Sequence, residues 1–184
     1  MPDQLLDLAV LMPASRDSAG REHLARLAGR LGYLAVHVQG ELDREELESL
    51  IAAADPAMVV VDETDDIPGI VRSNDPAEVR RARSFLDAQE DQRPLIVALP
   101  ISIGRTRNEA VARAAREPSF VGDSSPEVCG IFGTFEEAQE QVLELARAGA
   151  EVLLLTVPDE LDIADVLAQI RALVVGATPA LFQR

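Results

Sequence analysis

Two arginines beside a helix start form the clearest chemical pattern in this sequence. The run Gly104–Arg107 (GRTR) follows an apolar segment, and Thr106 and Glu109 have the spacing of a capping box. A guanidinium binds phosphate oxygens through paired N–H donors, and the free N–H groups of a helix N-terminus also attract anions. The pattern therefore makes Arg105, Thr106 and Arg107 candidate cofactor-binding residues. The alternative is a plain helix start with solvated arginines.

A histidine within an apolar run is the second candidate. His37 lies in the segment Tyr33–Val38, so it could point into the mouth of a barrel and titrate near neutral pH. The alternative is a histidine on a sheet face within the core. The other histidine, His23, lies in a helical pattern and is expected at the surface. We therefore name His37 as the candidate catalytic residue and leave the catalytic residues otherwise unassigned.

The remaining reactive residues do not form a recognisable site. Two histidines and one cysteine are too few for a nitrogen–sulfur metal cluster. The acidic run at 62–66 (DETDD) lacks the ligand spacing of an EF-hand loop, and the acid Glu127 disfavours a thiolate at Cys129. The sequence contains no phosphate loop, dinucleotide fingerprint or G-x-S-x-G elbow. We predict no metal site.

The composition is that of an acidic protein with a hydrophobic core. The chain has 184 residues, of which 47% are apolar, and we expect a single domain over 1–184. Its 32 acidic residues exceed 17 basic ones, all arginine, and the net charge of −15 disfavours binding to nucleic acid or anionic membranes. No apolar run approaches the ~20 residues of a membrane span, and the N-terminus lacks the pattern of a signal peptide. Together with the single cysteine, these features predict a cytoplasmic protein.

The segment Gly133–Val157 shows most clearly how the chain is built. Thr134 and Glu137 have capping-box spacing, and apolar residues then recur at helical intervals. Gly149 stands where the end of a helix needs a residue that tolerates positive φ. The apolar run Val152–Val157 is typical of a strand covered on both faces. This segment therefore predicts a capped helix followed by a buried strand.

The same alternation of strand and helix extends through the whole chain. Strands are predicted over Leu5–Met12, Tyr33–Val38, Ala57–Val61, Leu95–Ile103 (with a bend or an end at Pro100) and Val152–Val157. Helices are predicted to be capped by Ser18, Asp43, Asp75, Thr106, Thr134 and Asp162. Ile51 and Phe85 are expected on the inner faces of their helices.

Alternation with short connections predicts parallel strands joined by right-handed crossovers. The sequence therefore predicts an α/β fold with a mainly parallel sheet of about five strands. Such a sheet is either open and doubly wound, or part of a barrel that a partner chain completes.

Several of these segments resemble the bacterial-luciferase-like family of flavin- or F420-dependent oxidoreductases, which includes monooxygenases. ALPISIGRTRNEAVARA at 98–114 is similar to the family's strand that ends in a T-x-x-E-A helix start. GTFEEAQEQVLELARAGAEVLLL at 133–155 is similar to its closing G-[ST]-x-E-E unit, and Leu5–Val38 fits its opening strand, helix and strand. The resemblance implies a TIM-barrel-like fold, with the final strand beside the first and FMN or F420 at the carboxyl ends of the strands.

The chain also departs from the family's pattern. Family members are much longer, and their middle strands have no counterpart here. The acidic–histidine pair after the family's second strand is replaced by HVQGEL at 37–42. We therefore expect a truncated, TIM-barrel-like, luciferase-like domain.

Three functions stay open for such a domain. It is a shortened flavin- or F420-dependent oxidoreductase with an unknown small-molecule substrate, or a non-catalytic relative that acts as a homodimer or as a companion oxidoreductase subunit. The third possibility is an unrelated small α/β binding domain.

Overall fold

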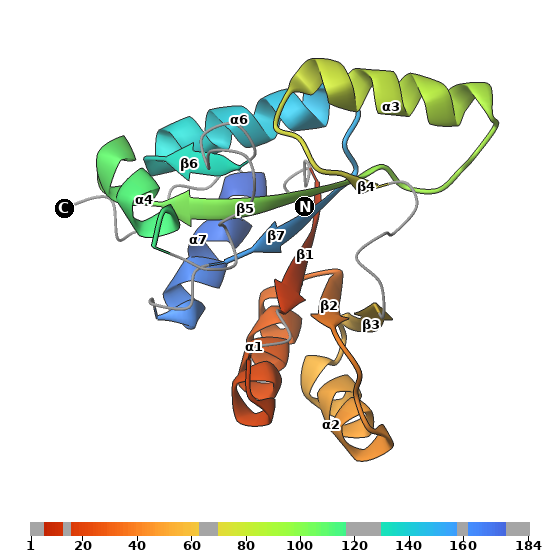
Figure 1. Ribbon diagram of the computed structural model, residues 1–184, viewed down its shortest axis with the longest axis vertical. Coiled ribbons are helices and arrows are strands. Elements are labelled where there is room, and N and C mark those ends of the chain that lie inside the picture. The colour runs from red at the N-terminus through yellow and green to blue at the C-terminus, as the bar shows by residue number, and fades with distance from the viewer. Residues whose placement is uncertain (1–5, 13–15, 63–69, 117–129, 158–161, 176–184) are drawn as a thin grey trace.

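The strands form one open, parallel sheet (Figure 1). The computed structural model describes residues 6–12, 16–62, 70–116, 130–157 and 162–175. The strands are β1 (Asp7–Met12), β2 (Ala35–Gln39), β3 (Met58–Asp62), β4 (Ile70–Val71), β5 (Ile96–Ile103), β6 (Ile131–Gly133) and β7 (Val152–Thr156). All pairings among these strands are parallel. The predicted α/β class is confirmed, and the short strands β4 and β6 add to the five that the sequence predicts.

The order of the strands shows how the chain winds through the sheet. The order is β3-β2-β1-β7-β5-β4, and β6 pairs with β5 outside this path. β4, β5 and β7 follow one another from one edge of the sheet to its centre. β1, β2 and β3 follow one another in the same direction, from the centre to the other edge. A doubly wound sheet reverses direction after its first half, whereas a barrel keeps one direction throughout. The sheet is therefore singly wound, like a barrel, although no described pairing joins β3 to β4.

Five helices form a layer on one face of this sheet: α1 (Ser18–Leu31), α2 (Arg44–Ala54), α3 (Pro76–Ala88), α6 (Phe135–Arg147) and α7 (Ile163–Val175). The remaining described helix, α4 (Arg107–Ala114), packs on the other face, where its Val111 and Ala114 contact Phe132 of β6. Within the layer α2 contacts α1, α1 contacts α7, α7 contacts α6 and α6 contacts α3. Right-handed crossovers that all move in one direction place their helices on one side of the sheet, so this layer follows from the winding.

The two faces of the sheet consequently differ. Leu8, Val10 and Met12 of β1 join the large core formed with the helices. Ala9 and Leu11 belong to a smaller cluster on the opposite side, which contains strand residues and no residue of a described helix. We call the part of this side that the cluster forms the helix-free face, and α4 covers the same side at the β5–β6 end. In Figure 1 the strands fan out from β5, which crosses the view, to β1 and β2, which run down it.

The last strand pairs with the first, as the family resemblance implies. Asp7–Leu11 of β1 runs in parallel register with β7. The helix before β7 begins with the predicted capping box, in which the Thr134 hydroxyl accepts from the Glu137 N–H and the Glu137 carboxylate accepts from the Thr134 N–H at 2.8 Å. Gly149 lies just beyond this helix with φ 105°, as predicted. The capped helix and buried strand predicted for Gly133–Val157 are therefore both present.

Two predictions about local structure need correction. The N-cap of α1 is Asp17, whose carboxylate accepts a hydrogen bond from the Gly20 N–H at 2.8 Å, and Ser18 is the first helical residue. β5 does not end at Pro100, but its ladder with β7 ends there and its ladder with β6 begins at Ile101. β7 and β6 pair with opposite sides of β5, so the strand continues through the proline. The other predicted caps, Asp43, Asp75, Thr106 and Asp162, are confirmed.

Two residues expected in the core are exposed instead. Ile51 of α2 is 53% exposed, and Phe85 of α3 is 64% exposed. These helices occupy the two ends of the helix layer, so each has a neighbouring helix on one side only. A helical pattern predicts which positions are apolar, but it does not show whether a neighbour covers them.

Candidate functional site

Polar side chains gather on the helix-free face near the carboxyl ends of the strands. Because all described pairings are parallel, these ends share one edge of the sheet, where barrel enzymes build their active sites. Leu11 of the helix-free cluster lies in register with His37 of β2 and Thr156 of β7. Alternation along each strand then places Gln39 and Ser102 on the same side of the sheet. At Ser102 this side is next to α4, because Phe132, in register with Ser102, packs against Val111 and Ala114. The middle of this face is apolar, so its polar side chains are concentrated at the edge that could bind a ligand.

His37 lies on this face, close to the carboxyl end of β2. Its neighbours in register are Leu11 on one side and Val60 on the other. The side chain is 7% exposed, so it is part of the buried surface of the sheet. A catalytic role for His37 stays a prediction. A location in the mouth of a barrel stays a prediction as well.

Ser102 is the least satisfied polar group in this region. It is 2% exposed, and its hydroxyl has no hydrogen-bond partner among the described residues. A buried polar group left without a partner costs about 1–3 kcal/mol, so such a group points to a partner beyond the described residues. Ser102 was missed in the sequence, although it is the one hydroxyl in the apolar strand IVALPISI. An alternating pattern could have identified it.

The predicted anion-binding residues lie on the same edge, at the end of β5. Thr106 caps α4 by accepting a hydrogen bond from the Glu109 N–H at 3.2 Å, and the Glu109 carboxylate accepts from the Arg105 N–H at 3.0 Å. The Arg107 guanidinium donates to the Phe132 carbonyl of β6 at 3.2 Å. Neither Arg105 nor Arg107 forms an ion pair within the described ranges, so both charges stay available to an anion.

The structure does not bring the two predicted groups into contact. His37 is on β2 and the arginines follow β5, so β1 and β7 lie between them. With strands about 4.8 Å apart, this separation is roughly 14 Å along a flat sheet. A ligand that used both groups would have to be long enough to span the edge.

An acidic hollow lies on the helix side, where α1 and α2 begin. Its volume is about 340 Å³, and it is lined by Ser18, Glu22, Asp43, Glu45, Glu46 and Ser49. Ion pairing and hydrogen bonding already engage parts of it: Arg21 contacts Glu46 at 3.1 Å, and the Ser49 hydroxyl donates to Glu22 at 2.6 Å. Within the described ranges, no three histidine, cysteine or acidic residues are grouped as metal ligands. Of the acidic run only Asp62 is described, and Cys129 lies outside the described residues.

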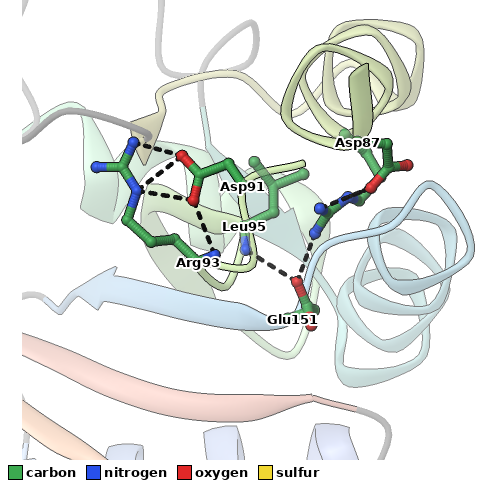
Figure 2. A network of polar contacts seen from close by, with 6 residues as sticks. Asp87, Asp91, Arg93, Leu95 and Glu151 are labelled. Atoms are coloured by element: carbon green, nitrogen blue, oxygen red, sulfur yellow. Dashed lines mark hydrogen bonds and ion pairs between the residues drawn. The ribbon is translucent and has the colours of Figure 1, made fainter. Parts of the chain in front are cut away.

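The opposite edge, at the amino ends of the strands, is held by ion pairs and hydrogen bonds (Figure 2). Arg83 of α3 contacts Asp87 at 2.7 Å and Glu151 at 2.8 Å. The Glu151 carboxylate also accepts from the Leu95 N–H at 3.0 Å, so one side chain joins α3 to the starts of β5 and β7. Nearby, hydrogen bonds from Arg93 hold the pKa of the Asp91 carboxyl below its ordinary value. These contacts serve the fold.

Comparisons with known proteins add little to this description. No protein-family model matches the chain, and no curated protein sequence matches it. Among solved structures it is similar to the crystal structure of the NADH-dependent reductase A1-R′ complexed with NAD, with 13% sequence identity and a TM-score of 0.25. The match covers 84% of this chain and 61% of the reductase chain, so this chain spans less than two thirds of the reductase. The fold assignment rests on the strand pairings. No helix in the described ranges is long and apolar enough to cross a membrane.

Proposed function

We propose that this chain is a shortened luciferase-like protein that binds a flavin or F420 at the carboxyl ends of its strands. The observation that carries the proposal is the buried Ser102 hydroxyl, which has no partner among the described residues and lies near the carboxyl end of β5. The winding of the sheet supports it, because β7 lies beside β1 as in a barrel. The motifs that resemble the luciferase-like family point the same way.

The residues at this edge fit the chemistry of such a cofactor. Ser102 would hydrogen-bond a polar atom of the ring, and Arg105 and Arg107 would bind the phosphate. The bound cofactor would supply hydride transfer. The imidazole of His37 would hold or accept a proton.

A cofactor titration tests this proposal. The full chain is titrated with FMN, with F420 and, as a further nucleotide cofactor, with NADH, and binding is followed by fluorescence. We expect micromolar binding of FMN or F420, weakened roughly tenfold by Ser102→Ala and by Arg107→Gln. Ser49→Ala is the control, because this serine lies on α2 and bonds to Glu22. Colourless purified protein with no micromolar affinity for FMN or F420 would contradict the proposal.

The second candidate function is that of a non-catalytic relative, which acts as a self-associating module or as a companion subunit of an oxidoreductase. A specific observation favours it: Met58 of the edge strand β3 is 55% exposed, and Ile51 of the adjacent α2 is 53% exposed. Such a protein would assemble whether or not a cofactor is bound. Light scattering at high protein concentration measures this, and a strictly monomeric chain would count against it.

A further inference from the structure

Ser102 is buried on the side of the sheet where α4 packs. Its side chain is 2% exposed, and its hydroxyl has no hydrogen-bond partner among the described residues. Ser102 lies in register with Phe132 of β6, and Phe132 forms a small apolar cluster with Val111 and Ala114 of α4. A cofactor therefore reaches this hydroxyl only after a neighbouring element on this side has moved. Among the described helices, α4 is the one that packs there.

α4 is the shortest described helix, and it buries the smallest side chains. It has eight residues, whereas the other described helices have 11 to 14. Its buried residues are Ala110 and Ala114, and its apolar cluster is separate from the large core. A helix shorter than about 12–15 residues is marginal by itself, and segments with few buried apolar contacts open at a lower free energy than the whole fold. α4 is therefore the described helix that we expect to open most readily.

One arginine holds the last turn of α4 against the sheet. The Arg113 guanidinium donates to the Ile103 carbonyl at the end of β5, at 2.7 Å. It also donates to the Glu109 carboxylate one turn earlier in α4, at 3.0 Å. The Arg113 side chain is 14% exposed, so solvent competes little for these bonds. The bond from Arg113 to Ile103 thus joins the second half of the helix to β5.

The start of α4 is fixed in a different way, by contacts of the turn that joins it to β5. The Gly104 N–H donates to the Gly133 carbonyl of β6 at 2.9 Å, and the Thr106 hydroxyl caps the helix by accepting from the Glu109 N–H. A Cβ added to Gly104 would lie 2.8 Å from the backbone nitrogen of Ala110, so the turn packs closely against the first turn of the helix. The start of α4 is therefore held independently of the bond that Arg113 makes.

We propose that α4 is a lid beside Ser102, hinged at the turn that joins it to β5 and latched by the hydrogen bond from Arg113 to the Ile103 carbonyl. This inference rests on the first candidate function and describes how the cofactor reaches the Ser102 hydroxyl. In the closed position this hydroxyl lacks a described partner. Opening lets water or the cofactor bond to it, which offsets part of the cost of releasing Arg113. A cofactor that binds only the open form associates in proportion to the fraction that is open.

Chemical labelling of a thiol at position 102 measures this opening without any cofactor. Ser102→Cys is made in the full chain together with Cys129→Ala, which removes the single native cysteine, and the thiol is labelled with iodoacetamide. Ala138→Cys on α6 is the matched control, because this position is fully buried in the large core and becomes accessible only when the whole fold opens. With each rate corrected for the free energy of unfolding of its variant, we expect labelling at position 102 to be faster by roughly tenfold or more.

A second substitution tests the latch. Arg113→Gln removes the guanidinium that bonds to the Ile103 carbonyl, and we expect it to make labelling at position 102 roughly tenfold faster. Arg116→Gln is the matched control: it removes the same charge, but Arg116 donates to the Ala112 carbonyl of α4 itself, at 3.1 Å. It should not change the labelling rate. In chains with the native Ser102, FMN should associate roughly tenfold faster with Arg113→Gln than with Arg116→Gln, measured by stopped-flow fluorescence.

The possible outcomes separate the lid from the proposed function. Labelling at position 102 that is no faster than labelling at position 138 overturns the lid, whether or not FMN binds. Labelling that is fast but equal in Arg113→Gln and Arg116→Gln overturns the latch. Acceleration by Arg113→Gln alone supports the proposal. If that acceleration is observed and neither FMN nor F420 binds, the lid is supported and the proposed cofactor is wrong.

Discussion

The two edges of the sheet satisfy their polar groups in different ways. At the amino edge, Glu151 accepts hydrogen bonds from both Arg83 and the Leu95 N–H, and its own N–H donates to the Leu95 carbonyl. At the carboxyl edge, the Ser102 hydroxyl has no partner among the described residues, and Arg107 contacts only a neutral carbonyl there. The first edge is closed by its own side chains. The second leaves one buried hydroxyl without a described partner, at the edge where barrel enzymes build their active sites.

The largest effect is expected from a change at the amino edge. Gly149→Ala adds a Cβ where φ is 105°, and this atom would lie 2.9 Å from Cγ of Arg83. Backbone strain and the displaced Arg83 side chain together should lower the free energy of unfolding by about 2–3 kcal/mol, measured by urea denaturation.

A second glycine provides the control for that prediction. Gly32 also has positive φ, but the nearest atom to its added Cβ would be at 3.8 Å. Gly32→Ala should therefore cost only the backbone strain, about 1 kcal/mol. Equal losses of unfolding free energy in the two variants would show that the contact with Arg83 does not contribute to the effect of Gly149→Ala.

The next effect concerns Tyr33, which precedes β2 at the amino edge. Its buried hydroxyl donates to the Leu167 carbonyl of α7 at 2.9 Å, and Tyr33→Phe should cost about 1–2 kcal/mol of unfolding free energy. Burial also raises the pKa of Tyr33 above its ordinary value.

That shift gives the Tyr33 prediction a pH dependence. The unfolded chain ionises its tyrosine above pH ~10, while the folded chain keeps it protonated. The stabilisation is therefore complete below pH ~10 and declines as the pH rises beyond it. Tyrosinate absorbance measures this directly, because the chain has one tyrosine and no tryptophan. A stability profile of Tyr33→Phe with the same alkaline decline would contradict the assignment.

A smaller loss is expected at Glu151. Its side chain is 54% exposed and that of Arg83 is 24% exposed, so solvent screens the ion pair. Glu151→Gln should lower the free energy of unfolding by about 0.5–1 kcal/mol, and the loss should shrink in high salt. Asp87→Asn removes only the contact of Arg83 within α3 and should cost less. A larger loss from Asp87→Asn would reverse the importance assigned to these two carboxylates.

At the carboxyl edge we expect a substitution to raise the free energy of unfolding instead of lowering it. Ser102→Ala removes a buried hydroxyl without a described partner, so the cofactor-free protein should gain up to about 1 kcal/mol of stability, measured by urea denaturation. Ser49→Ala, which loses a hydrogen bond to Glu22, should be destabilising. Destabilisation by Ser102→Ala would mean that the hydroxyl is already satisfied, and the contrast between the edges would disappear.

Local sequence patterns determined much of the fold. Thr134 with Glu137, and Asp43 with Glu46, form the helix starts that their spacing predicts, because a cap depends on side chains within one turn. The α/β class also followed from alternation along the chain, and the luciferase-like motifs predicted the position of β7 beside β1. The sequence placed His37 in a buried strand, and its side chain is buried on the helix-free face.

Other features depended on contacts between distant segments. The apolar pattern placed Phe85 in the core, but coverage of a helix depends on whether another helix packs beside it. The strand β4 is too short for a periodic pattern, and β5 continues through Pro100 because β6, which is distant in sequence, pairs with Ile101–Ile103. Ser102 became a candidate only when the sheet left its hydroxyl buried.

By itself, the sequence determined where helices and strands begin, because capping and alternation act over a few residues. Only the tertiary structure decided which polar groups lie unsatisfied at the carboxyl edge and which apolar ones lie exposed at β3. Burial depends on neighbours that the chain brings together from far apart.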